Sequence, residues 1–312
     1  MNLPVQIGSL RLEHPVLNGS GTFDAIAARR VFGDEVLERF PFAAFVSKTI
    51  TPEPRTGNPP PRLYETPAGL INSIGLPNKG LEGFLAADLP LLAELPVPLI
   101  VSVMATSHDG FARLVAAVGE RPETGALELN ISCPNVESGL IVGERPDETL
   151  ALLEAVRPLT GRPLIVKLTP NVADPAAVAL AAEAGGADAV SLVNTVKASA
   201  TDPDTAGPWL GGGSGGLSGP AIRAIALEQA ARVAAAVAIP VIGMGGIEAG
   251  SDALAFIDAG ASAVAVGTAS FRDPTAGARV RDELAGALAA RGSVDADRIA
   301  AQRSTTAGST ST

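Results

Sequence analysis

The sequence predicts an α/β fold, a (β/α)8 TIM barrel, and two patterns support this prediction. Eight short apolar or β-branched runs alternate with longer stretches rich in alanine and leucine along the 312 residues. Each apolar run also ends in small or polar residues, as barrel strands do at the face that carries an active site. A doubly wound parallel sheet is the weaker alternative.

The predicted elements are short and evenly spread. Strands are expected at residues 16–18, 44–48, 99–103, 126–131, 164–168, 189–193, 240–244 and 263–267. Helical stretches include residues 109–120, 146–160, 174–184, 219–238 and 251–259, several of which open with Asp, Ser or Pro. We expect one domain over residues 1–303, followed by a disordered Ser/Thr/Gly/Ala tail at 304–312.

Three further segments complete the predicted barrel. Residues 5–12 alternate in polarity around a Gly-Ser turn, which predicts an N-terminal β-hairpin that closes the bottom of the barrel. The connections 49–79 and 197–218 are unusually long, and each follows the carboxyl end of a strand. We therefore expect these two βα loops to roof a pocket on the C-terminal face.

Composition excludes several classes of protein. The chain is 46% hydrophobic and only 18% charged, which favours a globular fold over disorder. Its 23 basic and 33 acidic residues give a net charge of −10, which argues against nucleic-acid or anionic-membrane partners. No transmembrane span or signal peptide is evident, so a cytoplasmic protein is expected. One cysteine and two histidines are too few for an internal disulfide, a cysteine-ligated iron–sulfur cluster or a metal centre.

Polar residues and glycines gather just beyond the predicted strands. Lysines and asparagines are prominent among them, at Lys48, Lys167, Asn18, Asn130 and Asn194. Any one of these asparagines, taken alone, is better explained as a strand-end cap. Several unpaired charges and amides at an apolar barrel mouth are costly unless a ligand meets them, so together they predict a binding site.

The seventh and eighth predicted strands end in Gly-Met-Gly-Gly-Ile (243–247) and Val-Gly-Thr-Ala (266–269). Both sequences expose backbone amides without side-chain obstruction at the start of a helix, where barrels commonly bind a phosphate. A tight structural turn is the alternative.

The only cysteine, Cys133, follows the fourth predicted strand between Asn130 and Asn135. A lone cysteine is commonly a buried and inert residue. At the rim of a barrel, however, a thiol tuned by Lys48 or Lys167 can act as a proton acceptor. Nucleophilic catalysis is less natural, because no histidine accompanies the thiol.

Ten segments, taken together and in order, resemble the dihydroorotate dehydrogenase family, class 1, and most of all its class 1B catalytic subunit. The resemblance covers roughly residues 3–290 and rests on residues 20–23, 46–49, 57–62, 72–76, 130–135, 166–168, 193–195, 215–220, 243–247 and 267–268. Class 2 members of the family have a serine in place of Cys133 and carry an N-terminal membrane-associating extension, so both Cys133 and the short start favour class 1.

The resemblance implies an FMN across the top of the barrel and oxidation of (S)-dihydroorotate to orotate in de novo pyrimidine (UMP) biosynthesis. Cys133 would take the C5 proton while hydride leaves C6 for FMN. Residues 134–145 would form a lid that excludes water. The implied FMN contacts are Ser20, Gly21, Lys48, Thr49, Asn130, Lys167, Val193, Gly219, Gly245, Gly246, Gly267 and Thr268. The implied substrate contacts are Lys48, Asn72, Gly75, Leu76, Asn130, Asn135, Asn194 and Thr195.

Two segments depart from the family pattern. Ser102 stands where the family usually has an asparagine that reaches the flavin, so this contact is expected to be lost or water-mediated. Residues 197–213 also differ from the usual pattern.

The resemblance also implies partners. Class 1B enzymes pass electrons to NAD through a second subunit that carries FAD and a 2Fe–2S cluster, which a chain with one cysteine cannot hold by itself. The expected assembly is a heterotetramer, a dimer of this chain flanked by two electron-transfer subunits. A class 1A enzyme would instead be a homodimer that reduces fumarate directly.

Three readings outside class 1 remain open on the sequence. A Schiff-base aldolase or lyase would use Lys167 as the nucleophile and hold a phosphorylated sugar at Gly245 and Gly267. A phosphate- or flavin-binding subunit without activity would not need Cys133. A dihydropyrimidine dehydrogenase-type module that reduces uracil would use the same set of asparagines.

Overall fold

The computed structural model describes residues 4–132 and 142–307, and its central feature is an eight-stranded sheet in which the last strand pairs with the first and the others pair with their successors in the chain, except at the seam between the first and second strands. All of its paired strands are parallel. The strands are β3 (Val16–Asn18), β4 (Phe45–Val46), β7 (Leu99–Val103), β8 (Thr124–Asn130), β9 (Leu164–Lys167), β10 (Ala189–Leu192), β13 (Val241–Met244) and β14 (Ala263–Val266). The predicted (β/α)8 barrel and its eight predicted strands are confirmed.

A side chain closes the barrel between β3 and β4, the two ends of the strand order. The Asn18 amide donates to the carbonyl of Val46 at 2.8 Å and accepts from the Val46 N–H at 2.8 Å. The Ala43 N–H also donates to the carbonyl of Val16 at 2.9 Å. Asn18 is fully buried, and its amide supplies the paired donor and acceptor that a longer strand would offer. Asn18 is therefore a structural residue of the barrel wall.

Helices cover the outside of the barrel, and α5 (His108–Gly119) shows why they form there. Its N-cap, Ser107, accepts from the Gly110 N–H at 3.1 Å, and its buried residues Phe111, Leu114, Val115 and Val118 follow the spacing of one helical face. The other α-helices are α1 (Ala25–Phe32), α2 (Glu35–Glu38), α3 (Gly80–Gly83), α4 (Leu89–Leu92), α6 (Pro146–Val156), α7 (Pro175–Ala184), α8 (Arg223–Ala236), α9 (Gly250–Asp258), α10 (Ala269–Arg272) and α11 (Ala276–Ala307).

Four short turns of other helix types complete the secondary structure. They are the π-turn η1 (Phe84–Asp88) and the 3-10 turns η2 (Val142–Glu144), η3 (Arg157–Leu159) and η4 (Pro220–Ile222). The five predicted helical stretches are present. The second ends in η3 and the fourth begins with η4.

The predicted N-terminal hairpin is confirmed as β1 (Val5–Ile7) paired with β2 (Leu10–Leu12). Ile7, Leu10 and Leu12 are buried in one cluster with inward-facing residues of the barrel strands, among them Ile100 and Ile165. Burial of one such side chain contributes about 1.5–3 kcal/mol, so the hairpin is a stable floor for the barrel.

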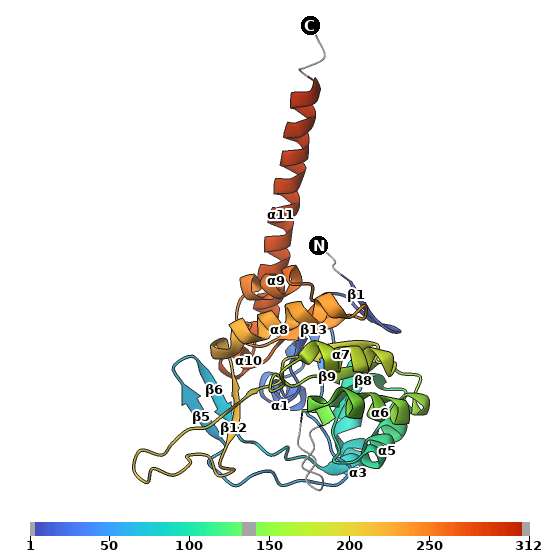
Figure 1. Cartoon of the computed structure of the whole chain (residues 1–312), viewed down its shortest axis with the longest axis vertical. Helices are drawn as coiled ribbons and strands as arrows, with labels where there is room; N and C mark the ends of the chain where they lie inside the picture. The colour runs from blue at the N-terminus through green and yellow to red at the C-terminus, as the bar shows by residue number, and fades with distance from the viewer. Residues whose placement is uncertain (1–3, 133–141, 308–312) are drawn as a thin grey trace.

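The two long connections form a second sheet, which the sequence did not predict. Its order is β11 (Val196–Ala198), β12 (Gly215–Ser218), β6 (Gly69–Asn72) and β5 (Leu63–Thr66), and every pair is antiparallel. Figure 1 shows β5, β6 and β12 together on one side of the barrel. A Cβ atom on Gly69 would lie 2.1 Å from the carbonyl of Ser218, so the strands can approach only where this residue is glycine.

The chain ends in the long helix α11, which extends away from the barrel (Figure 1). Residues 308–312 lie outside the described residues, and the predicted single domain over 1–303 with a disordered tail at 304–312 stays a prediction. Within the described residues, no helix has both the length and the apolar character needed to span a membrane.

His14, between β2 and β3, provides a test of this packing. Its Nδ1 accepts from the Val16 N–H at 3.3 Å, and burial, helped by the charge of Arg281 and opposed by Asp282, lowers the pKa of His14 to about 4. Because the unfolded chain binds this proton at a pKa of about 6.5, His14 lowers the stability of the fold as the pH falls from about 6.5 to 4.

We expect His14→Asn, which keeps a hydrogen-bond acceptor, to lose less stability in acid than the wild type does. Urea unfolding of the unliganded chain at pH 7.5 and pH 5 measures the difference, which should be about 1 kcal/mol once the partial exposure of His14 is allowed for. The same loss in both proteins would contradict the assigned burial of the imidazole.

Candidate active site

The carboxyl ends of the barrel strands bring the predicted site residues to one mouth. Successive residues of a strand face alternately into and out of the barrel. Ala126 and Ile165 face inward, because they belong to the buried cluster that packs against the N-terminal hairpin. Asn130 and Lys167 have the same parity on β8 and β9 and are register partners, so both lie on the inward side at the top of the barrel.

Two lysines, Lys48 and Lys167, share this mouth. Lys167 is buried, with 6% of its surface exposed, and Lys48 is half-buried after β4. Burial, together with the charge of Lys167, lowers the pKa of Lys48. No carboxylate among the described residues forms an ion pair with either lysine. Two cations held together in this way are suited to an anionic ligand.

A set of hydrogen bonds joins residues from several strands at the mouth. Thr49 Oγ1 lies 3.1 Å from Ser20 Oγ and accepts from Asn130 Nδ2 at 3.5 Å. Asn130 Oδ1 accepts from Asn194 Nδ2 at 3.4 Å, and Asn194 Oδ1 accepts from the Thr195 N–H at 2.8 Å. The structure thus brings together five of the residues that the sequence predicted for the site.

Gly21 borders the same cluster. Its φ is +72°, and a Cβ atom there would lie 3.1 Å from Lys48 Nζ. Glycine at this position therefore leaves room for the lysine side chain.

The second sheet brings Asn72 next to the cluster. Asn72 ends β6, and its Nδ2 donates to the carbonyl of Gly216 at 3.1 Å. A Cβ atom on Gly216 would lie 1.8 Å from Thr195 Oγ1, so the backbone of β12 passes directly against Thr195. Asn72 and Thr195, 123 positions apart in the sequence, therefore contact the same glycine of β12.

Gly75 and Leu76 follow β6 in an uncommon backbone conformation. Their φ angles are +74° and +54°, and the left-handed region is unfavourable for leucine. A Cβ atom on Gly75 would lie 2.4 Å from the backbone N of Asn58. Such constrained backbone is frequent at functional sites, in keeping with the predicted backbone contacts of this pair.

Glycines at the ends of β13 and β14 form a cradle with β12. Gly246 has φ +74°, and a Cβ atom there would lie 2.9 Å from the carbonyl of Gly219. Thr268 Oγ1 donates to Ser218 Oγ at 2.8 Å, which joins the end of β14 to β12. Within the described part of the chain, the N–H groups of Gly246, Gly267 and Thr268 have no acceptor. Free backbone donors on a surface without side chains fit the phosphate of a cofactor such as FMN.

Gly245 and Val193 complete this side of the mouth. Gly245 has φ +130°, and a Cβ atom there would lie 3.3 Å from Val193 Cγ2. Val193 is buried, and its N–H donates to the carbonyl of Met244 at 2.9 Å. Both predicted cofactor contacts therefore lie beside the glycine cradle.

Two predicted residues cannot be placed. Cys133, the predicted base, and Asn135, a predicted substrate contact, lie outside the described residues, together with most of the predicted lid at 134–145. Their roles stay predictions.

Glu128 and Ser191, which were not predicted from the sequence, are polar residues inside the barrel, and Glu128 also contacts Ser102. Glu128 is 3% exposed, and its two carboxylate oxygens accept from Ser102 Oγ at 3.2 Å and from Ser191 Oγ at 3.1 Å. Ser102 Oγ also lies 2.9 Å from Thr49 Oγ1. The alternation of residues along β8 could have identified Glu128, because it lies between Ala126 and Asn130, which both face into the barrel.

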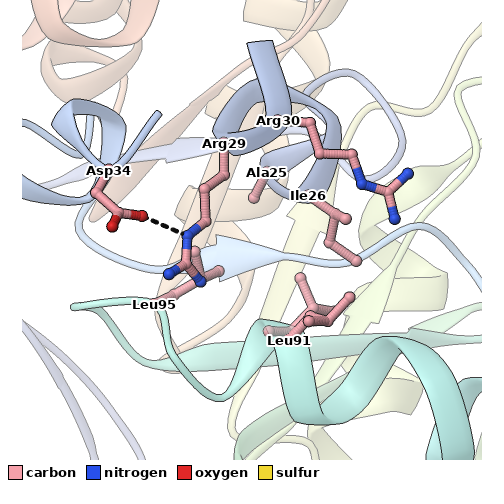
Figure 2. A pocket seen from close by; sticks show the side chains of 8 residues that line it. Ala25, Ile26, Arg29, Arg30, Asp34, Leu91 and Leu95 are labelled. Carbon is pink, nitrogen blue, oxygen red and sulfur yellow. Dashed lines mark hydrogen bonds and ion pairs between the residues drawn. The ribbon is translucent and has the colours of Figure 1, made fainter. Parts of the chain in front are cut away.

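A hollow of about 330 Å³ lies away from this mouth, on the outside between α1 and α4 (Figure 2). Arg29 crosses it to donate to Asp34 at 2.7 Å. None of the predicted site residues lines it. It is therefore separate from the site at the barrel mouth.

Known proteins resemble this chain over nearly its whole length. The model of the dihydroorotate dehydrogenase family matches residues 2–288. A "Dihydroorotate dehydrogenase B (NAD(+)), catalytic subunit" from Desulforudis audaxviator is 46% identical over 299 residues, 95% of each chain. The protein of the same name from Trichlorobacter lovleyi is 44% identical over 299 residues, 94% of this chain and 95% of the relative.

A solved structure agrees with these sequence comparisons. DHODH from Eimeria tenella, crystallised in complex with ferulenol, has a TM-score of 0.75 and 25% sequence identity, and the match covers 93% of this chain and 85% of that one. Fold, site positions and sequence similarity lead to one conclusion: this chain belongs to the dihydroorotate dehydrogenase family.

Proposed function

We propose that this chain is the catalytic subunit of a class 1B, NAD-dependent dihydroorotate dehydrogenase. It would oxidise (S)-dihydroorotate to orotate in de novo pyrimidine (UMP) biosynthesis. The observation that supports this most strongly is the 46% identity to a protein of that name over 95% of both chains. Because the match covers 95% of both chains, the two proteins are expected to share one arrangement of domains.

The residues at the barrel mouth fit FMN, which when bound supplies the acceptor for the hydride from C6 of the substrate. Gly245, Gly246, Gly267 and Thr268 would bind its phosphate through backbone N–H groups, with Gly219 and Val193 beside them. Ser20, Gly21, Lys48, Thr49 and Asn130 would contact its ring.

Lys167 would carry the electrostatic part of this site. Its buried ammonium group has no acidic partner among the described residues, so its charge is free to meet the negative charge that develops when the flavin is reduced. A low-dielectric surrounding makes such an interaction stronger than it would be in water.

Amide side chains would recognise the substrate. Amide groups can donate and accept, which suits a ring with both kinds of group, and the amides that would contact it are those of Asn72, Asn130, Asn135 and Asn194, with Thr195 next to the last of them. Lys48 would attract the carboxylate of dihydroorotate, which uracil lacks. Gly75 and Leu76 would add backbone contacts.

Cys133 would take the proton from C5. The cations Lys48 and Lys167 at the barrel mouth would favour its thiolate form, and the lid at 134–145 would exclude water while the proton moves. The thiol would return this proton to solvent when the lid opens.

A partner subunit would carry electrons onward. The relatives are named as the catalytic subunits of an NAD(+) enzyme, and a chain with one cysteine needs a partner to hold a 2Fe–2S cluster and FAD. We propose a heterotetramer built on a dimer of this chain and a location in the cytoplasm. Nucleic acid and membrane are not expected among its partners, given the net charge of −10.

The electron acceptor tests the class. The FMN-loaded chain is first reduced anaerobically with dihydroorotate, and then NAD or fumarate is added with and without the electron-transfer subunit. We expect NAD to restore the flavin colour only when the partner subunit is present, and fumarate to have no effect. Rapid reoxidation by fumarate alone would instead establish the class 1A alternative.

A further inference from the structure

We propose that Glu128 and Ser102 are positioning residues, which fix the orientation of the Asn130 and Asn194 amides through a chain of hydrogen bonds that runs in one direction. The inference rests on the proposed function, in which these amides bind the substrate. It assigns a role to a carboxylate that lies inside the barrel wall and that the proposed chemistry does not use.

The acidic end of the chain sets its direction. Ser102 Oγ donates its one hydroxyl proton to Glu128 Oε1 across 3.2 Å. Ser102 Oγ then accepts from Thr49 Oγ1 at 2.9 Å, which is a shorter contact than the 3.1 Å between Thr49 Oγ1 and Ser20 Oγ. Thr49 has thereby used its only proton and is left as an acceptor toward the mouth of the barrel.

The amide end agrees with this direction. Thr49 Oγ1 accepts from Asn130 Nδ2 at 3.5 Å, so the NH2 group of Asn130 faces the threonine and its oxygen faces the other way. That oxygen accepts from Asn194 Nδ2 at 3.4 Å, and Asn194 Oδ1 accepts from the Thr195 N–H at 2.8 Å. A backbone N–H can only donate, so both ends of the chain impose the same orientation.

Burial makes this orientation costly to reverse. The exposed fractions are 3% for Glu128, 0% for Ser102, 3% for Thr49 and 7% for Asn130, so water has little access to replace a mismatched partner. A rotated Asn130 amide would place its oxygen against the lone pairs of Thr49 and leave a buried acceptor without a donor.

Positive charge lies above the carboxylate on the inward side of the barrel, although no ion pair joins Lys167 to Glu128. Lys167 lies on β9, next to β8, and is the register partner of Asn130, two positions above Glu128 on its strand. The barrel interior therefore has positive charge at its mouth, from the two lysines, and a carboxylate below them.

The fixed orientation determines what the amides offer a ligand. Asn130 Oδ1 already accepts from Asn194 and from the Ser132 N–H at 3.3 Å, which uses both of its lone pairs. Asn130 Nδ2 has given one N–H to Thr49, and Asn194 Nδ2 has given one to Asn130. Among the residues that the structure describes, each amide therefore keeps one N–H without a partner, which would favour acceptor oxygens of a ligand at these two positions.

Orotate binding to the FMN-loaded enzyme tests the inference by titration calorimetry on Glu128→Gln, Ser102→Ala and the double variant. The glutamine amide can donate or accept, so it does not fix the direction of its hydrogen bond with Ser102. The alanine removes the Ser102 hydroxyl and interrupts the series of hydrogen bonds. We expect each single variant to weaken orotate binding about tenfold, which is about 1.4 kcal/mol, and the double variant to be no weaker than the singles.

Ser191→Ala is the matched control, because it removes the other hydroxyl that Glu128 binds without breaking the chain. It should bind orotate within about twofold of the wild type. Thermal unfolding of the same proteins separates a purely structural role, which would lower the melting temperature and leave the orotate affinity unchanged.

The outcomes are distinct. Single variants that bind orotate as the wild type does, or a control that is weakened as much as they are, would overturn the positioning role. If Glu128→Gln does not fold, Ser102→Ala, which keeps the carboxylate, decides the question alone. A folded, FMN-loaded wild type that does not bind orotate would refute the proposed function and, with it, this inference.

Discussion

Replacement of Cys133 by alanine should leave a yellow, FMN-loaded protein whose flavin is reduced by dihydroorotate about 10² to 10⁴ times more slowly than in the wild type. This is the range that a positioned general base contributes, and alanine has no group that can take the C5 proton. Anaerobic stopped-flow measurement of the flavin absorbance gives the rate of this half-reaction directly. Undiminished reduction would refute the assignment of Cys133 as the base.

Two companion variants sharpen this test. Cys133→Ser keeps a proton acceptor and should recover part of the rate as the pH is raised, because a hydroxyl gives up its proton less readily than a thiol. Ser132→Ala changes the neighbouring hydroxyl, which donates to the carbonyl of Lys167 at 3.3 Å, and tests whether any change in this loop slows the reaction. A loss of rate that is equal in Ser132→Ala and Cys133→Ala would contradict a specific role for the thiol.

Replacement of Lys167 by alanine should weaken FMN binding about 10- to 100-fold, because a hydrogen bond to a charged group contributes about 1.5–3 kcal/mol. The buried ammonium group of Lys167 has no acidic partner in the described part of the chain, so its removal takes away attraction for the flavin without freeing a protein carboxylate. Equilibrium dialysis of the unliganded chain against FMN measures the affinity without depending on turnover.

Lys197→Ala is the control for this prediction. Lys197 is exposed on β11, and its backbone N–H donates to Asn171 Oδ1 at 2.8 Å. Its substitution should leave FMN affinity unchanged. The aldolase alternative makes the opposite prediction for Lys167, because a Schiff-base lysine would be trapped on the substrate by borohydride in a protein without flavin.

Local patterns in the sequence were sufficient for the barrel. Each of the eight strands is a short apolar run with small or polar residues at its end, and the hairpin at residues 5–12 has its turn at Gly8. The second sheet was not predictable in this way, because β12 pairs with β6 across more than 140 residues. Its strands are short and glycine-rich, and their pairing depends on which backbones approach closely in the folded chain.

The site residues at the ends of barrel strands were predictable from the sequence. Lys48, Lys167, Asn130 and Asn194 follow or end barrel strands and meet at one mouth, as expected. Asn18 has the same position in its strand, yet its amide is used entirely in closing the barrel. Strand position alone does not distinguish these two roles, because the difference depends on which backbone groups the amide reaches.

The interior hydrogen-bond chain was not predictable from the sequence at all. Ser102 and Ser191 are 26 and 63 positions away from Glu128 in the sequence. No local sequence pattern indicates that they contact its carboxylate. The parity of β8 indicates only that Glu128 faces inward, where a charge requires partners. The identity of those partners follows from the parallel register of β7, β8, β9 and β10.

The central claim, that this chain oxidises dihydroorotate with a flavin at the barrel mouth, is tested most directly by its anaerobic visible spectrum. The purified chain, supplied with FMN, is recorded before and after an equimolar addition of dihydroorotate. We expect a flavin band that bleaches as the substrate is oxidised. Absence of a flavin band even with FMN supplied, or a band that dihydroorotate leaves unchanged, would contradict it.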